Sequence, residues 1–131
     1  MSIVTTVLAP VSEELFFRGL AYGPLFRKFG ATGAAVGSAL LWAAAHGSTF
    51  SYISVVRMSW VLILGVVYAE TYRRRESLIP TIAFHIIENT TAVLLVDWRY
   101  LPSLVAFSAV STSLWIMSAV LFHRVRRRRR P

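Results

Sequence analysis

Five apolar runs, each about as long as a membrane-spanning helix, occupy almost all of this 131-residue chain. A helix needs about 20 mostly apolar residues to cross the hydrocarbon core of a bilayer. Short basic segments separate several of the runs. The pattern predicts an all-α fold, a polytopic transmembrane bundle of about five membrane-spanning helices, at about residues 3–26, 31–50, 52–72, 77–96 and 101–122.

The composition favours a membrane protein over a soluble one. Hydrophobic residues make up 56% of the chain, more than is usual in a soluble domain. There is no cysteine, which excludes disulfides and thiolate metal sites. The formal net charge of +8 would suit a nucleic-acid partner, but the basic residues cluster between the apolar runs. We therefore expect a lipid bilayer and no nucleic acid as partner.

The basic clusters also predict an orientation. Arg27 and Lys28 follow the first run, three arginines at 73–75 follow the third, and the tail 124–131 carries six more. If five helices span, all three clusters lie on one side, and the positive-inside rule places that side in the cytoplasm. We interpret residues 1–123 as the core and the tail as a cytoplasmic topology anchor that contacts anionic lipid, rather than as a nucleic-acid-binding segment.

Charged residues interrupt the first run at Glu13, Glu14 and Arg18. Glu14 and Arg18 are four apart, so on a helix they share a face and can pair. Glu13 points about 100° away from Glu14, because a helix turns once in 3.6 residues. Charges at membrane depth face a protein interior or an aqueous cavity. The pattern predicts a paired carboxylate beside a second carboxylate that is free to act.

Two further polar pairs lie in other apolar runs. Trp42 and His46 are four apart in the second run, and His85 and Asn89 are four apart in the fourth. Each pair shares one helix face. A carboxylate, two imidazoles and an amide from three helices could polarise a water and donate to a developing oxyanion. Taken singly, an interfacial histidine or interhelical hydrogen bonds would explain each pair.

These motifs resemble those of the CPBP family of intramembrane proteases, also called Abi, which includes the CAAX prenyl endopeptidases. The family pattern is Glu-Glu-x-x-x-Arg, then aromatic-x-x-x-His, then His-x-x-x-Asn or Asp, on successive membrane helices. This chain has EELFFR at 13–18, WAAAH at 42–46 and HIIEN at 85–89. It departs in having Trp42 where phenylalanine is commoner. It also begins almost at the first motif. A minimal core, a truncated product or a chain that needs a partner would begin there.

The resemblance implies roles for four residues. Glu13 would be the catalytic carboxylate that activates water, aided by His46, while His85 and Asn89 would stabilise the tetrahedral oxyanion. Members of the family are described both as metalloproteases and as metal-independent glutamate proteases. The set Glu13, His46 and His85 matches a catalytic zinc ligand set and a water-activating triad equally well. A divalent metal such as zinc and a metal-free mechanism both stay open.

Supporting roles follow from the same resemblance. Glu14 and Arg18 would form a structural ion pair, and Trp42 an aromatic wall. We expect Glu88, the extra acid of the third motif, to act indirectly, through contact with the residues that react. Arg57 is expected to belong to an interfacial belt with most of the aromatic residues.

The expected activity is that of an intramembrane endopeptidase of the CPBP/CAAX type, in a bacterial cell membrane. Its substrate would be a peptide or protein at the membrane, either prenylated or bacteriocin-like. A catalytically silent scaffold or immunity-type protein, a truncated member of the family, is the alternative. A small transporter subunit that carries protons on buried carboxylates is a third hypothesis.

Overall fold

The computed structural model describes residues 3–46 and 52–95, together with Ala106 and Ala109. By its contacts the chain divides into two units, residues 1–95 and 96–131, and the account below concerns the first. Its described residues form helices and the turns between them, with no strand. The all-α prediction is therefore confirmed. The expected fifth helix at 101–122 and the basic tail at 124–131 lie outside the residues that can be described, apart from Ala106 and Ala109.

The first apolar run forms a continuous helix in which π-helical turns alternate with α-helical ones. The order is η1 (Val4–Leu8), α1 (Ala9–Glu14), η2 (Leu15–Ala21) and then α2 (Tyr22–His46). In the π-helical turns the backbone hydrogen bonds join residues five apart, as from the Tyr22 N–H to the Phe17 carbonyl. Such turns are rare overall, but those that occur are often found at functional sites. Here the two glutamates of the Glu-Glu-x-x-x-Arg motif end α1, and its arginine lies within η2.

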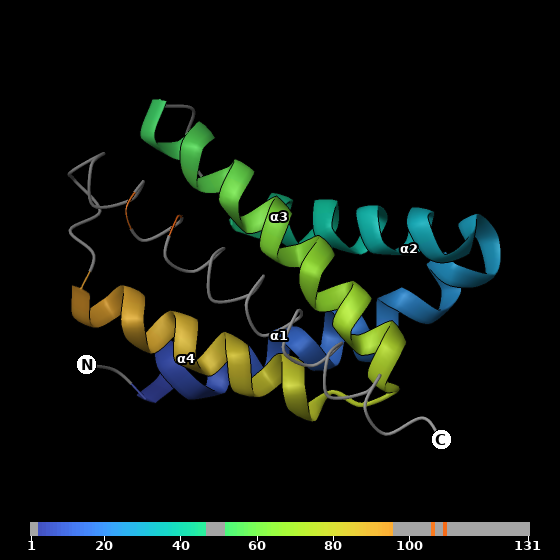
Figure 1. Ribbon diagram of the computed structural model, residues 1–131, viewed down its shortest axis with the longest axis horizontal. Helices are drawn as coiled ribbons and strands as arrows, with labels where there is room; N and C mark the ends of the chain where they lie inside the picture. The colour runs from blue at the N-terminus through green and yellow to red at the C-terminus, as the bar shows by residue number, and fades with distance from the viewer. Residues whose placement is uncertain (1–2, 47–51, 96–105, 107–108, 110–131) are drawn as a thin grey trace, which may run out of the picture. The chain divides into compact units, whose positions relative to one another are not determined.

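Gly30 introduces a kink that divides α2 into two helical segments. Its backbone has φ 71° and ψ −173°, a left-handed conformation that glycine adopts without a steric penalty. A Cβ at this position would meet no neighbouring atom, so the backbone angle rather than crowding is what requires glycine. The chain turns a corner here, between the first and second apolar runs (Figure 1).

The other two helices are α3 (Tyr52–Arg75) and α4 (Ile79–Leu95). They are joined by a three-residue turn in which Glu76 has a positive φ of 52°. Ser77 acts as an N-terminal cap of α4, because its Oγ accepts a hydrogen bond from the Ile79 N–H at 3.3 Å. Pro80 lies in the first turn, where the missing N–H is not needed.

Of the described helices one, over Val55–Arg75 within α3, is long and apolar enough to cross a membrane. The expectation of five spans is therefore not confirmed. In the first run the sequence itself supplies the reason, since Glu13, Glu14 and Arg18 interrupt it and Arg27 and Lys28 follow it directly. The kink at Gly30 then separates that run from the next.

The described residues have an unusual distribution between interior and surface. Charged side chains are fully buried at Glu14 and Arg18, while large apolar side chains are exposed on the outer face of the first helix, for example Leu15 at 52% and Leu20 at 65%. The outer face of α4 is similar, with Ile87 59% exposed. A surface of this kind is stable against lipid rather than against water.

Helices α2 and α3 approach each other closely through small residues. Ala34, Ala35, Ser38 and Ala39 are all buried on one side of α2, as the Gly, Ala and Ser content of the second run predicts. Gly65 of α3 lies against them. A Cβ on Gly65 would stand 2.8 Å from the Cβ of Ala39 and 3.1 Å from the Trp42 ring, so glycine sets the separation of the two helices.

Replacing Gly65 by Ala is therefore expected to destabilise the protein by about 1–3 kcal/mol through overpacking. Gly23→Ala is the matched control, because the nearest atom to its new Cβ is Arg27 Nη1 at an ordinary 3.8 Å. Both substitutions replace glycine by alanine within a helix, so both raise the helix propensity by the same amount. Denaturant unfolding of the detergent-purified protein, followed by circular dichroism, measures the difference. Equal stability of the two variants would contradict the packing argument.

Candidate active site

The Glu14–Arg18 pair lies at the centre of the described helices. Arg18 Nη1 donates to Glu14 Oε1 at 2.9 Å, and both side chains are 0% exposed. The second terminal nitrogen, Nη2, donates to the Gly65 carbonyl on α3 at 3.0 Å. The guanidinium also lies 4.9 Å from the centre of the Trp42 ring and 5.3 Å from that of Tyr68. These contacts join the first helix to α2 and α3.

Glu13 faces a different set of groups. Its side chain is 25% exposed, and Oε2 accepts a hydrogen bond from the Trp42 indole N–H at 2.5 Å. The same oxygen lies 3.7 Å from His46 Nε2 and 3.8 Å from His85 Nε2. The structure thus brings together, around one carboxylate oxygen, a side chain from each of the three sequence motifs.

The other ring nitrogen of each histidine has an oxygen acceptor. His46 Nδ1 lies 2.9 Å from the Trp42 carbonyl, and His85 Nδ1 lies 3.1 Å from Glu14 Oε1. A carbonyl and a carboxylate only accept hydrogen bonds, so each Nδ1 carries the proton. Both Nε2 atoms, when neutral, therefore present a lone pair toward Glu13, and when protonated they present an N–H.

Glu14 has a second role beyond its pairing with Arg18. Its Oε1 accepts from Arg18 Nη1 and also from His85 Nδ1, so the same oxygen orients an imidazole of the site. His85 is 3% exposed and packs between Trp42 and Tyr68, with ring centres 5.2 and 5.4 Å away. The Trp42 ring meets it at 82° and the Tyr68 ring at 33°, while its Nδ1 is held by Glu14.

Asn89 is placed differently from the other predicted site residues. It lies one turn beyond His85 on α4, and its Nδ2 donates to the backbone carbonyl of Thr5 in η1 at 3.0 Å. This bond ties α4 to the start of the chain. A carboxamide has two N–H groups, so one remains beyond the contact with Thr5. Glu88, beside it in sequence, is buried on α4.

Three residues near the site do not stand out in the sequence. Gly65 supplies the carbonyl that accepts from Arg18, and Tyr68 supplies a ring against Arg18 and His85. Both lie in a run so uniformly apolar that no inward face can be distinguished. Arg57 is the third residue, which we expected in an interfacial belt. Its Nη2 donates to the His46 carbonyl at 3.2 Å, so it contacts the end of α2. Gly65 and Tyr68 lie about one helical turn apart, and this spacing was the available signal for those two residues.

A metal ion is not matched by the side-chain geometry of this site. Across residues 3–46 and 52–95, no three His, Asp or Glu side chains converge as a ligand set. The Glu13 oxygen that faces both histidines also accepts a hydrogen bond from the Trp42 N–H. We therefore derive no step of the chemistry through a metal.

The site combines a carboxylate with two imidazoles, and the helices that carry it expose large apolar side chains. Comparison with known families agrees: residues 1–91 match the family model described as type II CAAX prenyl endopeptidase, Rce1-like. The match covers more than half of the chain, so this protein belongs to that family of membrane-embedded proteases, and the resemblance read from the motifs is confirmed. No curated protein and no solved structure was found to match.

Replacing Glu14 by Gln tests how the site depends on the buried pair. The amide keeps the shape but leaves Arg18 as a buried cation with a neutral partner, so we expect a loss of about 3–5 kcal/mol of stability. Glu70→Gln is the matched control, because Glu70 pairs with Arg73 at 2.7 Å on an exposed surface, where ion pairs contribute little. Similar unfolding curves for the two variants would show that the Glu14–Arg18 pair does not stabilise the fold.

Proposed function

We propose that this protein is an intramembrane endopeptidase that hydrolyses a peptide bond with a water activated by Glu13 and His46. The observation that carries the proposal is the convergence of His46 Nε2 and His85 Nε2 on Glu13 Oε2, at 3.7 and 3.8 Å. These distances are too long for direct hydrogen bonds. They suit a water that bridges the carboxylate and an imidazole.

The first step uses the lone pair on His46 Nε2. The water donates one hydrogen to Glu13 Oε2 and the other to His46 Nε2, and loses one of these protons as its oxygen attacks the peptide carbonyl carbon. The carbonyl π bond breaks and its electron pair becomes the oxyanion. The proton is later passed to the amide nitrogen, so that the C–N bond breaks and the products are a carboxylic acid and an amine.

His85 and Asn89 are proposed to stabilise the oxyanion. A protonated His85 would donate from Nε2, and the contact of its Nδ1 with Glu14 Oε1 at 3.1 Å fixes the direction of the ring. Asn89 would contribute the N–H that its contact with Thr5 leaves over. Donors fixed in place before the reaction stabilise developing charge more than water does. The buried, packed ring of His85 meets that requirement.

For the substrate we propose a prenylated peptide with a C-terminal CAAX sequence, that is, a cysteine, two aliphatic residues and a variable last residue. The family description supports this choice. A bacteriocin-like peptide is the second substrate class, and a bacterial membrane with a cytoplasmic C-terminus remains the proposed location. A silent scaffold would bind such peptides without cleaving them, so cleavage itself decides between the two functions.

Glu13→Gln is expected to abolish cleavage of a fluorogenic farnesylated CAAX peptide, because the amide cannot accept a proton from water. The variant should keep its fold, since Glu13 is 25% exposed and faces two histidines at 3.7 and 3.8 Å, whereas Glu14 is fully buried against Arg18. Loss of a general base typically lowers the rate by about 10²–10⁴-fold. Glu76→Gln, at an exposed turn, is the matched control. Retained cleavage in the Glu13 variant would refute the mechanism, and no cleavage by the unaltered protein would favour the scaffold.

Chelation gives a separate test. Because no step is assigned to a metal, we expect cleavage by the purified protein to survive EDTA and 1,10-phenanthroline. Elemental analysis of the same preparation should find no stoichiometric zinc. Zinc present in the unaltered protein and lost in His85→Ala, together with inhibition by chelator, would show that Glu13, His46 and His85 are metal ligands instead.

A further inference from the structure

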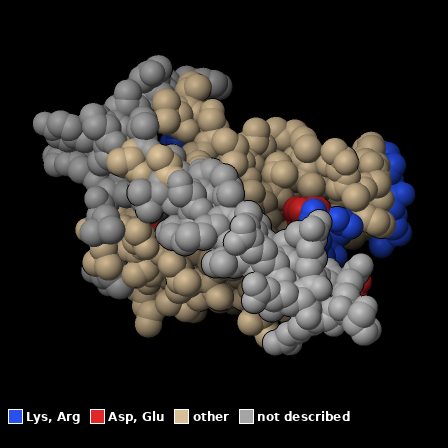
Figure 2. All heavy atoms as spheres, viewed as in Figure 1, with Lys and Arg blue, Asp and Glu red and all other residues tan. Residues whose placement is uncertain are grey.

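Basic residues from two helices gather at one end of the described unit, away from the candidate site. Arg27 and Lys28 lie just before the corner at Gly30, and Arg73, Arg74 and Arg75 end α3. All five are exposed. Figure 2 shows Lys and Arg side chains gathered at the right-hand end of the molecule. We call this group the basic end.

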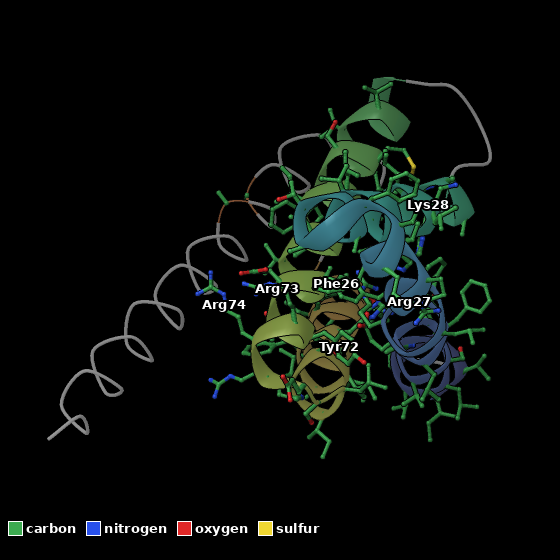
Figure 3. All side chains as sticks on the ribbon, turned by 90° about the vertical axis from the view of Figure 1, so that its right-hand side faces the viewer. Phe26, Arg27, Lys28, Tyr72, Arg73 and Arg74 are labelled. Atoms are coloured by element: carbon green, nitrogen blue, oxygen red, sulfur yellow. The ribbon has the colours of Figure 1, made fainter. Side chains whose placement is uncertain are left out.

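An aromatic cluster beneath the charges holds the two segments together. The ring of Tyr22 lies 5.6 Å from that of Tyr72 on α3 and 6.0 Å from that of Phe26. Tyr22 is buried, and Tyr72 packs against the same cluster. Figure 3 looks onto this end and shows Arg27 and Lys28 on one side of Phe26 and Tyr72, with Arg73 and Arg74 on the other. The cations from the two helices thus form one surface.

The carboxylates at this end neutralise only part of its charge. Glu70 accepts from Arg73 at 2.7 Å through both oxygens and also from Arg74 at 2.5 Å. Glu76 is the second acid beside these arginines. Even without Arg75, the four cations Arg27, Lys28, Arg73 and Arg74 against two carboxylates leave two net positive charges. Arg27 and Lys28 form no ion pair with a described residue.

The basic end also lies where a lipid headgroup would be. It terminates the apolar span Val55–Arg75, and exposed aromatic side chains adjoin it, with Phe26 45% and Phe29 57% exposed. Lys28 lies 5.1 Å from the Phe29 ring. Aromatic and basic side chains together at the end of a span are typical of the membrane–water interface.

We infer that the basic end binds the headgroups of anionic phospholipids. The phosphate supplies the charge that Glu70 and Glu76 leave unmatched, and the acyl chains lie along the exposed apolar faces of the same helices. A soluble acidic protein would have to displace lipid from Phe26 and Phe29 to reach the same cations. This property is independent of proteolysis, and its test uses no peptide substrate.

The test compares spin-labelled phosphatidylglycerol with spin-labelled phosphatidylcholine in phosphatidylcholine vesicles that contain the full chain. Electron paramagnetic resonance gives the association constant of each lipid from its motionally restricted fraction. We expect phosphatidylglycerol to bind more tightly, with a preference that falls as salt is raised, because exposed charges are screened. Equal binding of the two lipids would overturn the inference.

Variants assign the preference to the basic end. R27Q/K28Q should lower it by about threefold or more at low salt, since each basic residue near a membrane surface adds a several-fold attraction. R27K/K28R keeps both charges and should keep the preference. The tail arginines remain in every variant, so an unchanged preference in R27Q/K28Q would place lipid binding elsewhere and refute the proposal.

Glu70→Gln provides a change of the opposite sign. It releases Arg73 and Arg74 from their shared carboxylate, so the preference for phosphatidylglycerol should rise, which general damage to the fold would not produce. A fall would refute an electrostatic origin. Loss of the preference on adding inorganic phosphate at constant ionic strength would identify free phosphate as the ligand and overturn the assignment to lipid.

Discussion

A guanidinium with no access to water connects the described helices. Arg18 is 0% exposed, and moving a charge out of water is costly unless its partners are in place. Those partners come from separate elements: Glu14 from its own helix, the Gly65 carbonyl from α3 and the Trp42 ring from α2. Through Glu14 the network reaches His85 on α4. The contacts of Arg18 therefore also position Glu14, Trp42 and, through Glu14, His85, so the fold and the candidate site depend on the same charge.

Adjacent glutamates acquire different chemistry because a helix turns between them. Glu14 points into the interior and shares one oxygen between a guanidinium and an imidazole. Glu13 points toward the Trp42 indole and the Nε2 atoms of two histidines, and keeps 25% of its surface exposed. Glu14 thus binds the guanidinium and orients His85 through the same oxygen. The proposed mechanism leaves Glu13 to accept a proton from water.

Much of this site follows from spacing within helices, and the remainder depends on contacts between them. The pairing of Glu14 with Arg18 is local, because residues four apart meet on one helix face. The bond from Asn89 to the Thr5 carbonyl joins residues 84 apart, and a pattern along the chain does not encode that contact. Tyr68 and Gly65 are hidden for a different reason, since residues 60–69 form an unbroken apolar stretch in which no inward face is marked. The prediction of five spans is not confirmed: among the described residues one helix is long and apolar enough to cross a membrane, and nearly all of the fifth run lies outside them.

The π-helical turns of η2 have a consequence for how this segment can vary. Each such turn holds one residue more than an α-helical turn would, and in η2 these turns lie between the glutamates and the helix that carries Trp42 and His46. Deleting or inserting one residue there would rotate the carboxylates by about 100° relative to everything downstream. The side chains of Leu15, Phe16 and Leu20 are each more than half exposed, so other apolar residues would serve in their place. In this stretch the number of residues and the arginine at position 18 must be preserved, whereas the exposed apolar residues can vary.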